Sequence, residues 1–263
     1  MLKYLGFLLL LIVIISGGYY LVTYMQDAQA EPQKITEGRM ETKGTSIDYF
    51  ENIHGYYAEP VDAGDYPGVI MIHEWWGLNE HMKTQADELA SHGYRVLAVD
   101  LFGSVATTAD QARTQVAGLD QARALENLKA AERYLRSKGA TRIASLGWCF
   151  GGGQALQLSI VPGERLDATV IYYGTPLVTE EEKLKGINWP VLGIFGDVDQ
   201  AIPTTTVEEF KGALTKLNIR NDIRIYPGVG HAFANPSNAG FAPQETADAW
   251  ATTLAFLEEN LKS

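Results

Sequence analysis

The stretch 143-IASLGWCFGGG-153 decides the fold of this chain. It opens as a short apolar run typical of a buried strand, and its glycines lead into a helix predicted over 153–160. Only a tight turn fits between the two, with Cys149 at its centre, above the sheet edge and at a helix N-terminus that favours an anion. A lone Cys is usually a small buried hydrophobe, but the flanking glycines, which give a strained turn room, favour a nucleophile here.

Strands and helices alternate on both sides of this turn. Strands are expected at 68–73, 94–99, 143–146, 168–173, 191–195 and 223–226, with one or two edge strands within 47–57. Helices are expected to include 86–92, 121–138, 153–160, 207–217 and 245–261. Alternation of this kind requires right-handed crossovers, so we predict an α/β fold: a single domain of α/β-hydrolase type, with a mainly parallel sheet and helices on both faces.

The composition excludes several classes of function. Of the 263 residues, 46% are apolar and 20% charged, which is ordinary for a folded domain and excludes bulk disorder. Lys and Arg number 21 against 32 Asp and Glu, a net charge of −11, so nucleic acid would be repelled. The single cysteine excludes an intramolecular disulfide and a Cys-based metal cluster. We expect no nucleic-acid partner, no cofactor and no metal.

The first thirty residues are expected to lie outside the domain. No charged residue lies between Lys3 and Asp27, and a helix over positions 4–26 would reach roughly 35 Å, enough to cross a bilayer core. Lys3 on the inner side then puts the domain outside the cytoplasm. The sequence 28-AQA-30 resembles a cleavage site, so a secreted form is the alternative, and a segment with no membrane role is a third. We divide the chain into an apolar anchor or signal helix (1–30), a tether (31–45) and the α/β domain (46–263).

Two further strand ends suit a catalytic His and its carboxylate. His231 follows the strand 223–226 in a glycine-flanked loop, a setting that packing explains poorly. The turn after 191–195 offers Asp197 and Asp199, although Asp is common in turns for its own hydrogen bonds. We prefer Asp199 because of its spacing to Ile202-Pro203. The chain order Cys149, Asp199, His231 matches nucleophile, acid and base in α/β-hydrolases, so we predict a catalytic triad.

The run 73-HEWWG-77 marks the end of the first buried strand. A backbone N–H after an early strand and the N–H after the nucleophile form the oxyanion hole of such folds, which nominates the amides of Trp75 and Phe150. Glu74 is unusual, since a carboxylate at the mouth of a site costs desolvation unless it has a function. His73 beside Glu74 suggests a metal pair, but adjacent strand residues point to opposite faces, so we expect no metal there.

Together these segments resemble the dienelactone hydrolases, members of the α/β-hydrolase fold with a cysteine nucleophile. The resemblance spans most of residues 40–262 and rests on 73-HEWWGLN-79, 100-DLFG-103, 147-GWCFGG-152, Asp199 with Ile202-Pro203, and 230-GHAF-233. It implies that Cys149 is the nucleophile, His231 the base and Asp199 its orienting carboxylate. It also implies that Glu74 is the accessory carboxylate of the family, which contacts the resting thiol and shifts when substrate binds.

One position departs from the family pattern. Family members that act on dienelactone carry an Arg a few positions after the catalytic His, where this chain has Asn235. An amide hydrogen-bonds a substrate carboxylate but brings no charge. The resemblance therefore implies the chemistry of the family without implying dienelactone as the substrate.

The expected function is hydrolysis of carboxylic esters or lactones through an acyl-thioester. Thiolate is a good leaving group, which favours enol lactones, aryl esters and thioesters over alkyl esters and amides. A carboxylesterase or thioesterase of other substrate range is the alternative, and a non-catalytic binding or thiol-sensing module is a weaker one. We expect a monomer that binds a small-molecule substrate in a pocket lined by Trp76, Phe102, Phe233 and Asn235.

Overall fold

An eight-stranded sheet forms the centre of the computed structural model, which describes residues 38–163 and 165–263. Its order is β1-β2-β4-β3-β5-β6-β7-β8, and pairing is parallel from β4 to β8. The β1–β2 hairpin and its pairing with β4 are antiparallel. The strands are β1 (Thr42–Phe50), β2 (Ile53–Pro60), β3 (Gly68–Ile72), β4 (Arg95–Val99), β5 (Ile143–Trp148), β6 (Ala168–Tyr172), β7 (Val191–Gly196) and β8 (Asn221–Tyr226). The predicted mainly parallel sheet is confirmed.

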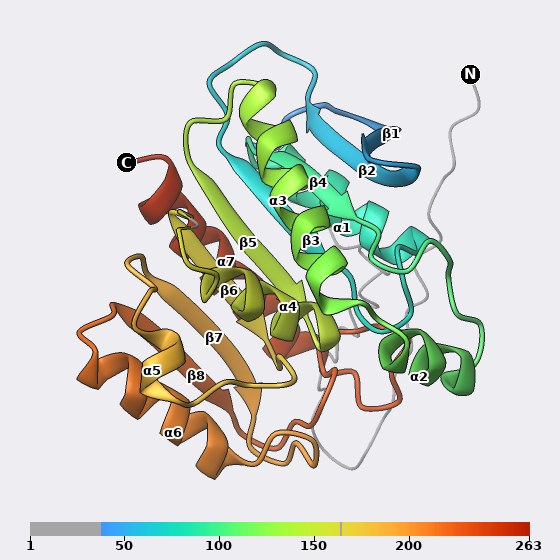
Figure 1. Cartoon of the computed structure of the whole chain (residues 1–263). Coiled ribbons are helices and arrows are strands. Elements are labelled where there is room, and N and C mark those ends of the chain that lie inside the picture. The colour runs from blue at the N-terminus through green and yellow to red at the C-terminus, as the bar shows by residue number, and fades with distance from the viewer. Residues whose placement is uncertain (1–37, 164) are drawn as a thin grey trace, which may run out of the picture. The chain divides into compact units, whose positions relative to one another are not determined.

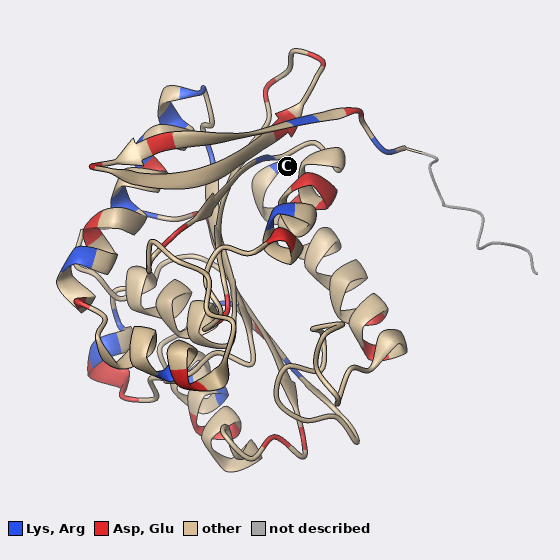
Figure 2. Ribbon diagram, turned by 90° about the vertical axis from the view of Figure 1, so that its right-hand side faces the viewer, with Lys and Arg blue, Asp and Glu red and all other residues tan. Residues whose placement is uncertain are grey.

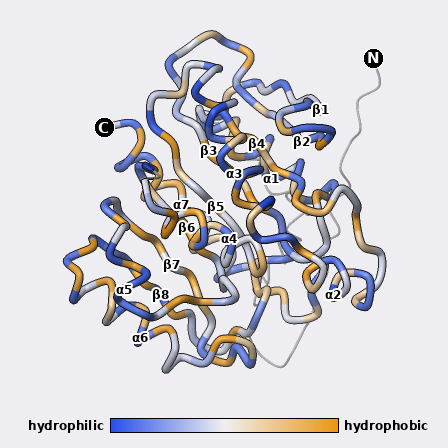
Figure 3. Tube along the Cα trace, viewed as in Figure 1, coloured by the Kyte–Doolittle hydropathy of each residue, from blue (hydrophilic) through white to orange (hydrophobic). Residues whose placement is uncertain are grey.

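The central strands are apolar along their whole length. Every residue of β3, β5, β6 and β7 is buried, and Figure 3 shows mostly orange and white along these strands. A parallel strand covered on both faces has no solvent side, so its sequence is a continuous apolar run. These runs are the reason that the strands were predictable from sequence.

Helices cover both faces of the sheet, as predicted. They are α1 (Glu80–Ser91), α2 (Ala109–Ala117), α3 (Gln121–Ser137), α4 (Phe150–Ser159), α5 (Glu181–Leu184), α6 (Thr204–Lys216) and α7 (Pro243–Leu261). Figure 1 shows α3, α4 and α6 in front of the sheet and α1 and α7 behind it. At the back, Lys262 Nζ donates to the carbonyl oxygen of His92 at 2.6 Å and ties the ends of α7 and α1 together.

Several boundaries differ from the sequence prediction. Strand β1 begins at Thr42, inside the predicted tether 31–45, because this mostly exposed edge strand has no apolar alternation to mark it. Helix α4 begins at Phe150 rather than 153, since glycine is a poor helix former and conceals the first turn. Helices α2 and α5 were not predicted. Each buries a single residue, Ala112 and Leu184 respectively, so neither shows amphipathic periodicity.

The predicted anchor or signal segment, residues 1–30, lies outside the described residues. Among residues 38–163 and 165–263, no helix combines the length and apolar character needed to span a bilayer. The membrane prediction therefore rests on the sequence of residues 1–30 alone.

Candidate active site

The turn between β5 and α4 holds Cys149 at positive φ. Its backbone has φ +54° and ψ −119°, a conformation that residues with a side chain rarely adopt. The turn is possible because the flanking glycines leave no side chain in the way. A Cβ on Gly147 would lie 2.1 Å from the carbonyl oxygen of Gly151, and one on Gly151 would lie 2.3 Å from that of Ile72. The result is a half-buried thiol at the carboxyl edge of the sheet.

Three side chains from three strand ends form a continuous chain of contacts. His231 Nε2 lies 3.0 Å from Cys149 Sγ, and His231 Nδ1 lies 2.8 Å from Asp199 Oδ2. The Asp199 side chain is fully buried, whereas the His231 side chain is 26% exposed. The imidazole thus bridges a partly accessible thiol and a shielded carboxylate.

The structure separates the two candidate carboxylates after β7. Asp199 accepts the backbone amides of Ala201 at 2.7 Å and Ile202 at 3.1 Å on Oδ1, which leaves Oδ2 for His231. Asp197 Oδ1 instead accepts the amide of Gly228 at 2.6 Å and holds the loop after β8 in place. Of the two carboxylates, Asp199 is therefore the one hydrogen-bonded to the imidazole.

The neighbours of His231 favour its charged form. Burial opposes a charge on the ring, but hydrogen bonds to Asp199 and Cys149, with the charges of both, raise the pKa of His231 to about 10. A protonated imidazole donates from both nitrogens, so it donates to the carboxylate and to the sulfur together. This arrangement stabilises negative charge on Cys149 Sγ.

Two backbone amides are free at the end of β3 and the start of α4. Phe150 is the first residue of α4, so its N–H has no acceptor within the helix. In the described part of the chain, no acceptor takes the N–H of Trp75 either. Gly151 packs against the carbonyl groups of Ile72 and His73, which brings the start of α4 directly against the end of β3. Both predicted oxyanion donors lie beside this contact.

Glu74 is buried at the same edge, with 6% of its surface exposed. Its Oε2 accepts from Asn235 Nδ2, and its Oε1 has no hydrogen-bond partner among the described residues. Burial raises the pKa of Glu74 to about 7, against the opposing effects of the Asn235 hydrogen bond and the His231 charge. The family resemblance led us to expect Glu74 on the resting thiol. Instead, Asn235 holds the carboxylate and His231 holds the thiol.

A cavity of about 430 Å³ opens over the thiol. Its walls are the segment Glu74 to Trp76, Cys149, His231 and residues of the loop between Ala232 and Ala239. Two indole rings, Trp75 and Trp76, meet edge to face at 5.0 Å on one side. None of the lining residues is Lys or Arg, and the described residues contain no cluster of three or more His, Cys, Asp or Glu that would hold a metal ion.

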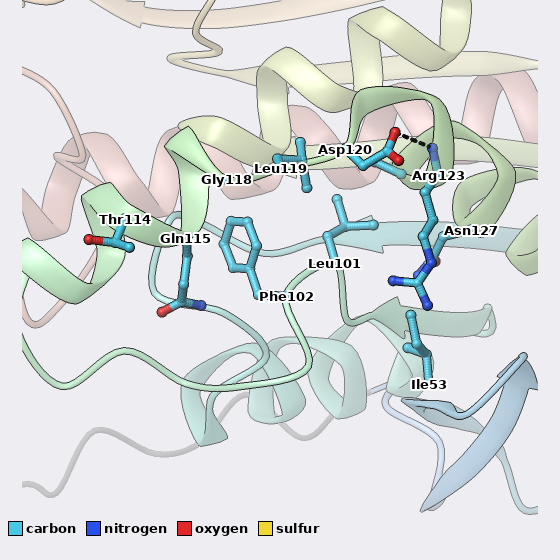
Figure 4. Close-up of a pocket in the computed structure, with 11 residues that line it drawn as sticks. Ile53, Leu101, Phe102, Thr114, Gln115, Gly118, Leu119, Asp120, Arg123 and Asn127 are labelled. Atoms are coloured by element: carbon cyan, nitrogen blue, oxygen red, sulfur yellow. Dashed lines mark hydrogen bonds between the residues drawn. The ribbon is translucent and has the colours of Figure 1, made fainter.

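The structure corrects two predicted pocket residues. Phe102 lines a different cavity, of about 330 Å³, where Figure 4 shows its ring between Gln115 and Leu101. Phe233 has no exposed surface and packs against the rings of Tyr173 and Tyr226. Both were nominated as aromatic residues near functional motifs, but neither faces the thiol. Trp76 and Asn235 do line the cavity over Cys149.

The sequence prediction missed two parts of the site. Ser237, Asn238 and Ala239 line the cavity from a loop whose sequence carries no catalytic motif. Tyr173 directly follows β6 and lies fully buried, with its ring centroid 5.3 Å from that of His231. Burial and the nearby charges of Glu74 and Cys149 hold the pKa of Tyr173 well above its usual range, so it is a neutral wall. Its place at a strand end was the only available signal.

Comparison with known proteins agrees with the family resemblance seen in the sequence. The sequence profile described as "Dienelactone hydrolase family" matches residues 53–261. A Synechocystis protein named "Putative carboxymethylenebutenolidase" is 28% identical over 234 residues, covering 80% of this chain and 93% of that protein. A Bradyrhizobium protein named "Probable 2-oxo-3-(5-oxofuran-2-ylidene)propanoate lactonase" is 29% identical over 222 residues, covering 78% and 89%. A crystal structure described as "Putative Dienelactone Hydrolase" from Klebsiella pneumoniae superposes with a TM-score of 0.75 at 28% identity, covering 82% and 98%. This chain belongs to the dienelactone hydrolase family.

Proposed function

We propose that this protein hydrolyses carboxylic esters or lactones, with Cys149 as nucleophile, His231 as acid–base and Asp199 as the carboxylate that orients it. The observation that carries the proposal is the unbroken series of contacts from thiol to imidazole to carboxylate, at 3.0 and 2.8 Å, inside a cavity with free backbone amides. Such a series, with the nucleophile on a strained strand-to-helix turn, is the arrangement that acyl transfer requires.

The proposed reaction proceeds in two stages. The Cys149 thiolate attacks the carbonyl carbon, the new C–S bond forms, and the carbonyl electron pair moves to oxygen, where the N–H groups of Trp75 and Phe150 stabilise it. The oxyanion collapses, the bond to the leaving oxygen breaks, and the departing group takes the proton of His231. Water then gives a proton to His231 and attacks the acyl-thioester, which releases the acid and regenerates the thiolate.

The walls of the cavity favour neutral substrates. Its ionisable lining groups are Glu74, Cys149 and His231, and no Lys or Arg is present to pair with a substrate carboxylate. Asn235 donates one N–H of its amide to Glu74, and the amide carries no charge to pair with a substrate carboxylate. These contacts support a carboxylesterase with uncharged activated esters or enol lactones as substrates, rather than a lactonase for carboxylate-bearing lactones such as the Bradyrhizobium relative is named for.

Location is a separate proposal, based on the apolar run at positions 4–26. We propose that it anchors the chain with the domain outside the cytoplasm. Alkaline carbonate extraction of membranes from cells expressing the full chain should leave the protein in the pellet. Recovery of a shortened protein that begins after Ala30 in the soluble fraction would instead support the cleaved alternative.

Stopped-flow hydrolysis of p-nitrophenyl acetate by the full chain tests the proposed chemistry. We expect a burst of one p-nitrophenol per active site, absent in Cys149→Ala and strongly slowed in Cys149→Ser. A covalent acetyl group on the peptide containing Cys149 should appear by mass spectrometry on the same timescale. A burst that persists in Cys149→Ala would overturn the assignment of the nucleophile.

A further inference from the structure

His73 is fully buried at the end of β3, and the proposed reaction gives it no task. Its imidazole lies between two phenyl rings, with centroids 5.0 Å from Phe102 and 6.0 Å from Phe150. Phe102 also lines the cavity of Figure 4, whereas His73 is not among its lining residues and has no exposed surface. A polar ring in such a place costs free energy unless both of its nitrogens are hydrogen-bonded.

The hydrogen bonds of His73 determine its tautomer. The backbone N–H of Leu101 lies 3.1 Å from Nε2 and can only donate, so Nε2 carries the lone pair. Nδ1 therefore carries the proton and donates to the carbonyl oxygen of Glu74, at 2.6 Å. Burial lowers the pKa of His73, which keeps the ring neutral. Both nitrogens thus bind backbone groups, one just after β3 and the other just after β4.

The Glu74 carbonyl belongs to the same peptide unit as the N–H of Trp75. A trans peptide is planar, with its C=O and N–H on opposite sides, so a hydrogen bond that holds the oxygen also sets the direction of the N–H. The amide of Gly77 donates to the same oxygen at 3.2 Å, which makes the His73 bond the shorter of the two. A hydrogen bond to the oxygen also polarises the peptide and strengthens its N–H as a donor.

We propose that His73 is a positioning residue for the oxyanion hole. Its Nδ1–H aims the Trp75 amide, and its ring packs against Phe150, whose amide is the second donor. One buried side chain therefore aligns both donors, without contacting the substrate. The inference rests on the proposed function, because it requires an oxyanion to be formed at Cys149.

Two substitutions separate the two hydrogen bonds. In His73→Asn, the side-chain Nδ2 takes the place of the ring Nδ1 and still donates to the Glu74 carbonyl, while the Leu101 amide loses its acceptor. In His73→Gln, Oε1 takes the place of Nε2 and still accepts from Leu101, while the Glu74 carbonyl loses the shorter of its two hydrogen bonds and keeps the one from Gly77. Each variant loses one buried hydrogen bond, so the two serve as matched controls for stability.

The full-chain variants are compared by two reactions at Cys149. Acetylation by p-nitrophenyl acetate passes through an oxyanion, whereas alkylation by iodoacetamide does not. We expect His73→Gln to slow the acetylation burst by roughly 10- to 100-fold. A misdirected oxyanion donor should reduce the rate by less than the complete loss of that donor would. We expect His73→Asn to stay within about threefold of the unsubstituted protein, and alkylation to stay within about twofold in both.

The outcomes distinguish this inference from the proposed function. Equal loss of acetylation in both variants, or alkylation that falls in parallel with it, would overturn the positioning role. Absence of a burst in the unsubstituted protein would instead contradict the proposed function. If a variant fails to fold, nitrogen-15 NMR of histidine-labelled full chain still tests the geometry, because a neutral Nε2–H tautomer at His73 contradicts the inference.

Discussion

Glu74 and His231 line one cavity, and both have raised pKa values for opposite physical reasons. The His231 ring gains from its charge, because Asp199 and Cys149 lie in direct contact with it. Glu74 is destabilised by its charge, because burial removes the carboxylate from water. When folding raises the pKa of a His, the folded state is stabilised at pH values below the pKa of the unfolded state. This stabilisation is lost as the pH rises through the pKa of the folded state. When folding raises the pKa of a Glu, the folded state is destabilised instead. The destabilisation begins as the pH rises above the pKa of the carboxyl in the unfolded state.

The first prediction concerns Glu74→Gln. The folded protein holds Glu74 at a pKa of about 7, from an ordinary value of 4.5, so the cost of ionising it develops between these pH values. Gln removes this cost, which is roughly 3 kcal/mol when complete. We expect the variant to have a Tm several degrees above the parent at pH 8, and a matching Tm near pH 4, in differential scanning calorimetry. An equal Tm difference at both pH values would contradict the assignment.

The second prediction tests the carboxylate assignment. Asp199→Asn keeps an acceptor for the amides of Ala201 and Ile202 but removes the charge beside His231. We expect kcat for p-nitrophenyl acetate to fall roughly 10³- to 10⁴-fold, as in other triads. Asp197→Asn is the matched control, because Asp197 accepts from the Gly228 amide and, among the described residues, has no hydrogen bond to His231. The kcat of this variant should stay within about threefold of the unsubstituted protein. Similar losses in both variants would point to a general effect of charge in this turn.

At the scale of single elements, the glycines of α4 hold the nucleophile turn against β3. Three consecutive glycines follow Phe150 in the first turn of the helix, which on propensity alone would be a poor beginning. Backbone groups of β3 and of the segment after β6 occupy the space where their side chains would lie. The glycines lower the helix propensity of α4, but they allow its backbone to approach the end of β3 closely. This approach places Phe150 beside the end of β3.

The third prediction compares two glycine-to-alanine substitutions within helices. In Gly151→Ala, the new Cβ would lie 2.3 Å from the Ile72 carbonyl oxygen, so the free energy of unfolding should fall by about 3 kcal/mol or more and the burst should disappear. In Gly212→Ala, in α6, the new Cβ meets nothing within 4 Å. That variant should gain about 0.5–1 kcal/mol from helix propensity and keep full activity. Urea unfolding measures both, and equal stability of the two variants would refute the steric argument.

The helices and strands that could be predicted from sequence are those whose residues are buried either periodically, on one face, or along their whole length. The apolar runs of β3 and β5 to β7 are recognisable because these strands are covered on both faces. Helix α2 buries only Ala112, and β1 is a mostly exposed edge strand, so neither carries such a signal. Their positions depend on neighbours that are distant in sequence.

For the whole molecule, charge distribution and substrate charge are linked. The net charge is −11, and Figure 2 shows the acidic and basic residues on helices, loops and outer strands, with the central strands almost free of them. The cavity over Cys149 has Glu74 in its wall and no Lys or Arg. An anionic ester therefore meets repulsion on approach, and on arrival it finds no Lys or Arg, since the charge of the His231 imidazole is already shared with Asp199 and Cys149.

The fourth prediction follows from this distribution of charge. For matched aryl esters, we expect kcat/KM for the neutral one to exceed that for its carboxylate-bearing analogue by about tenfold or more at low ionic strength. The gap should narrow in about 0.5 M salt, which screens charges. In Asn235→Arg, the ratio should fall by about tenfold, since a cation then faces the bound carboxylate. A preference for the anionic ester in the unsubstituted protein would contradict the proposed substrate class.

The sequence by itself determined the parallel sheet, the turn that holds Cys149 and the chain order of the three residues of the proposed triad. Alternating apolar runs and amphipathic helices require a parallel sheet, and 147-GWCFG-151 places a thiol at its edge. These features are local, because each depends on side-chain periodicity or turn geometry within a few residues.

Only the tertiary structure decided which groups meet. It brings Asp199 rather than Asp197 to His231, places Asn235 on Glu74, and turns Phe102 and Phe233 away from the thiol. It also joins His73 to the backbone of Leu101, on the neighbouring strand end. Contacts of this kind depend on how segments distant in sequence pack together. Two carboxylates in one turn have the same local sequence pattern whichever of them faces the site, and so do two aromatic residues near one motif.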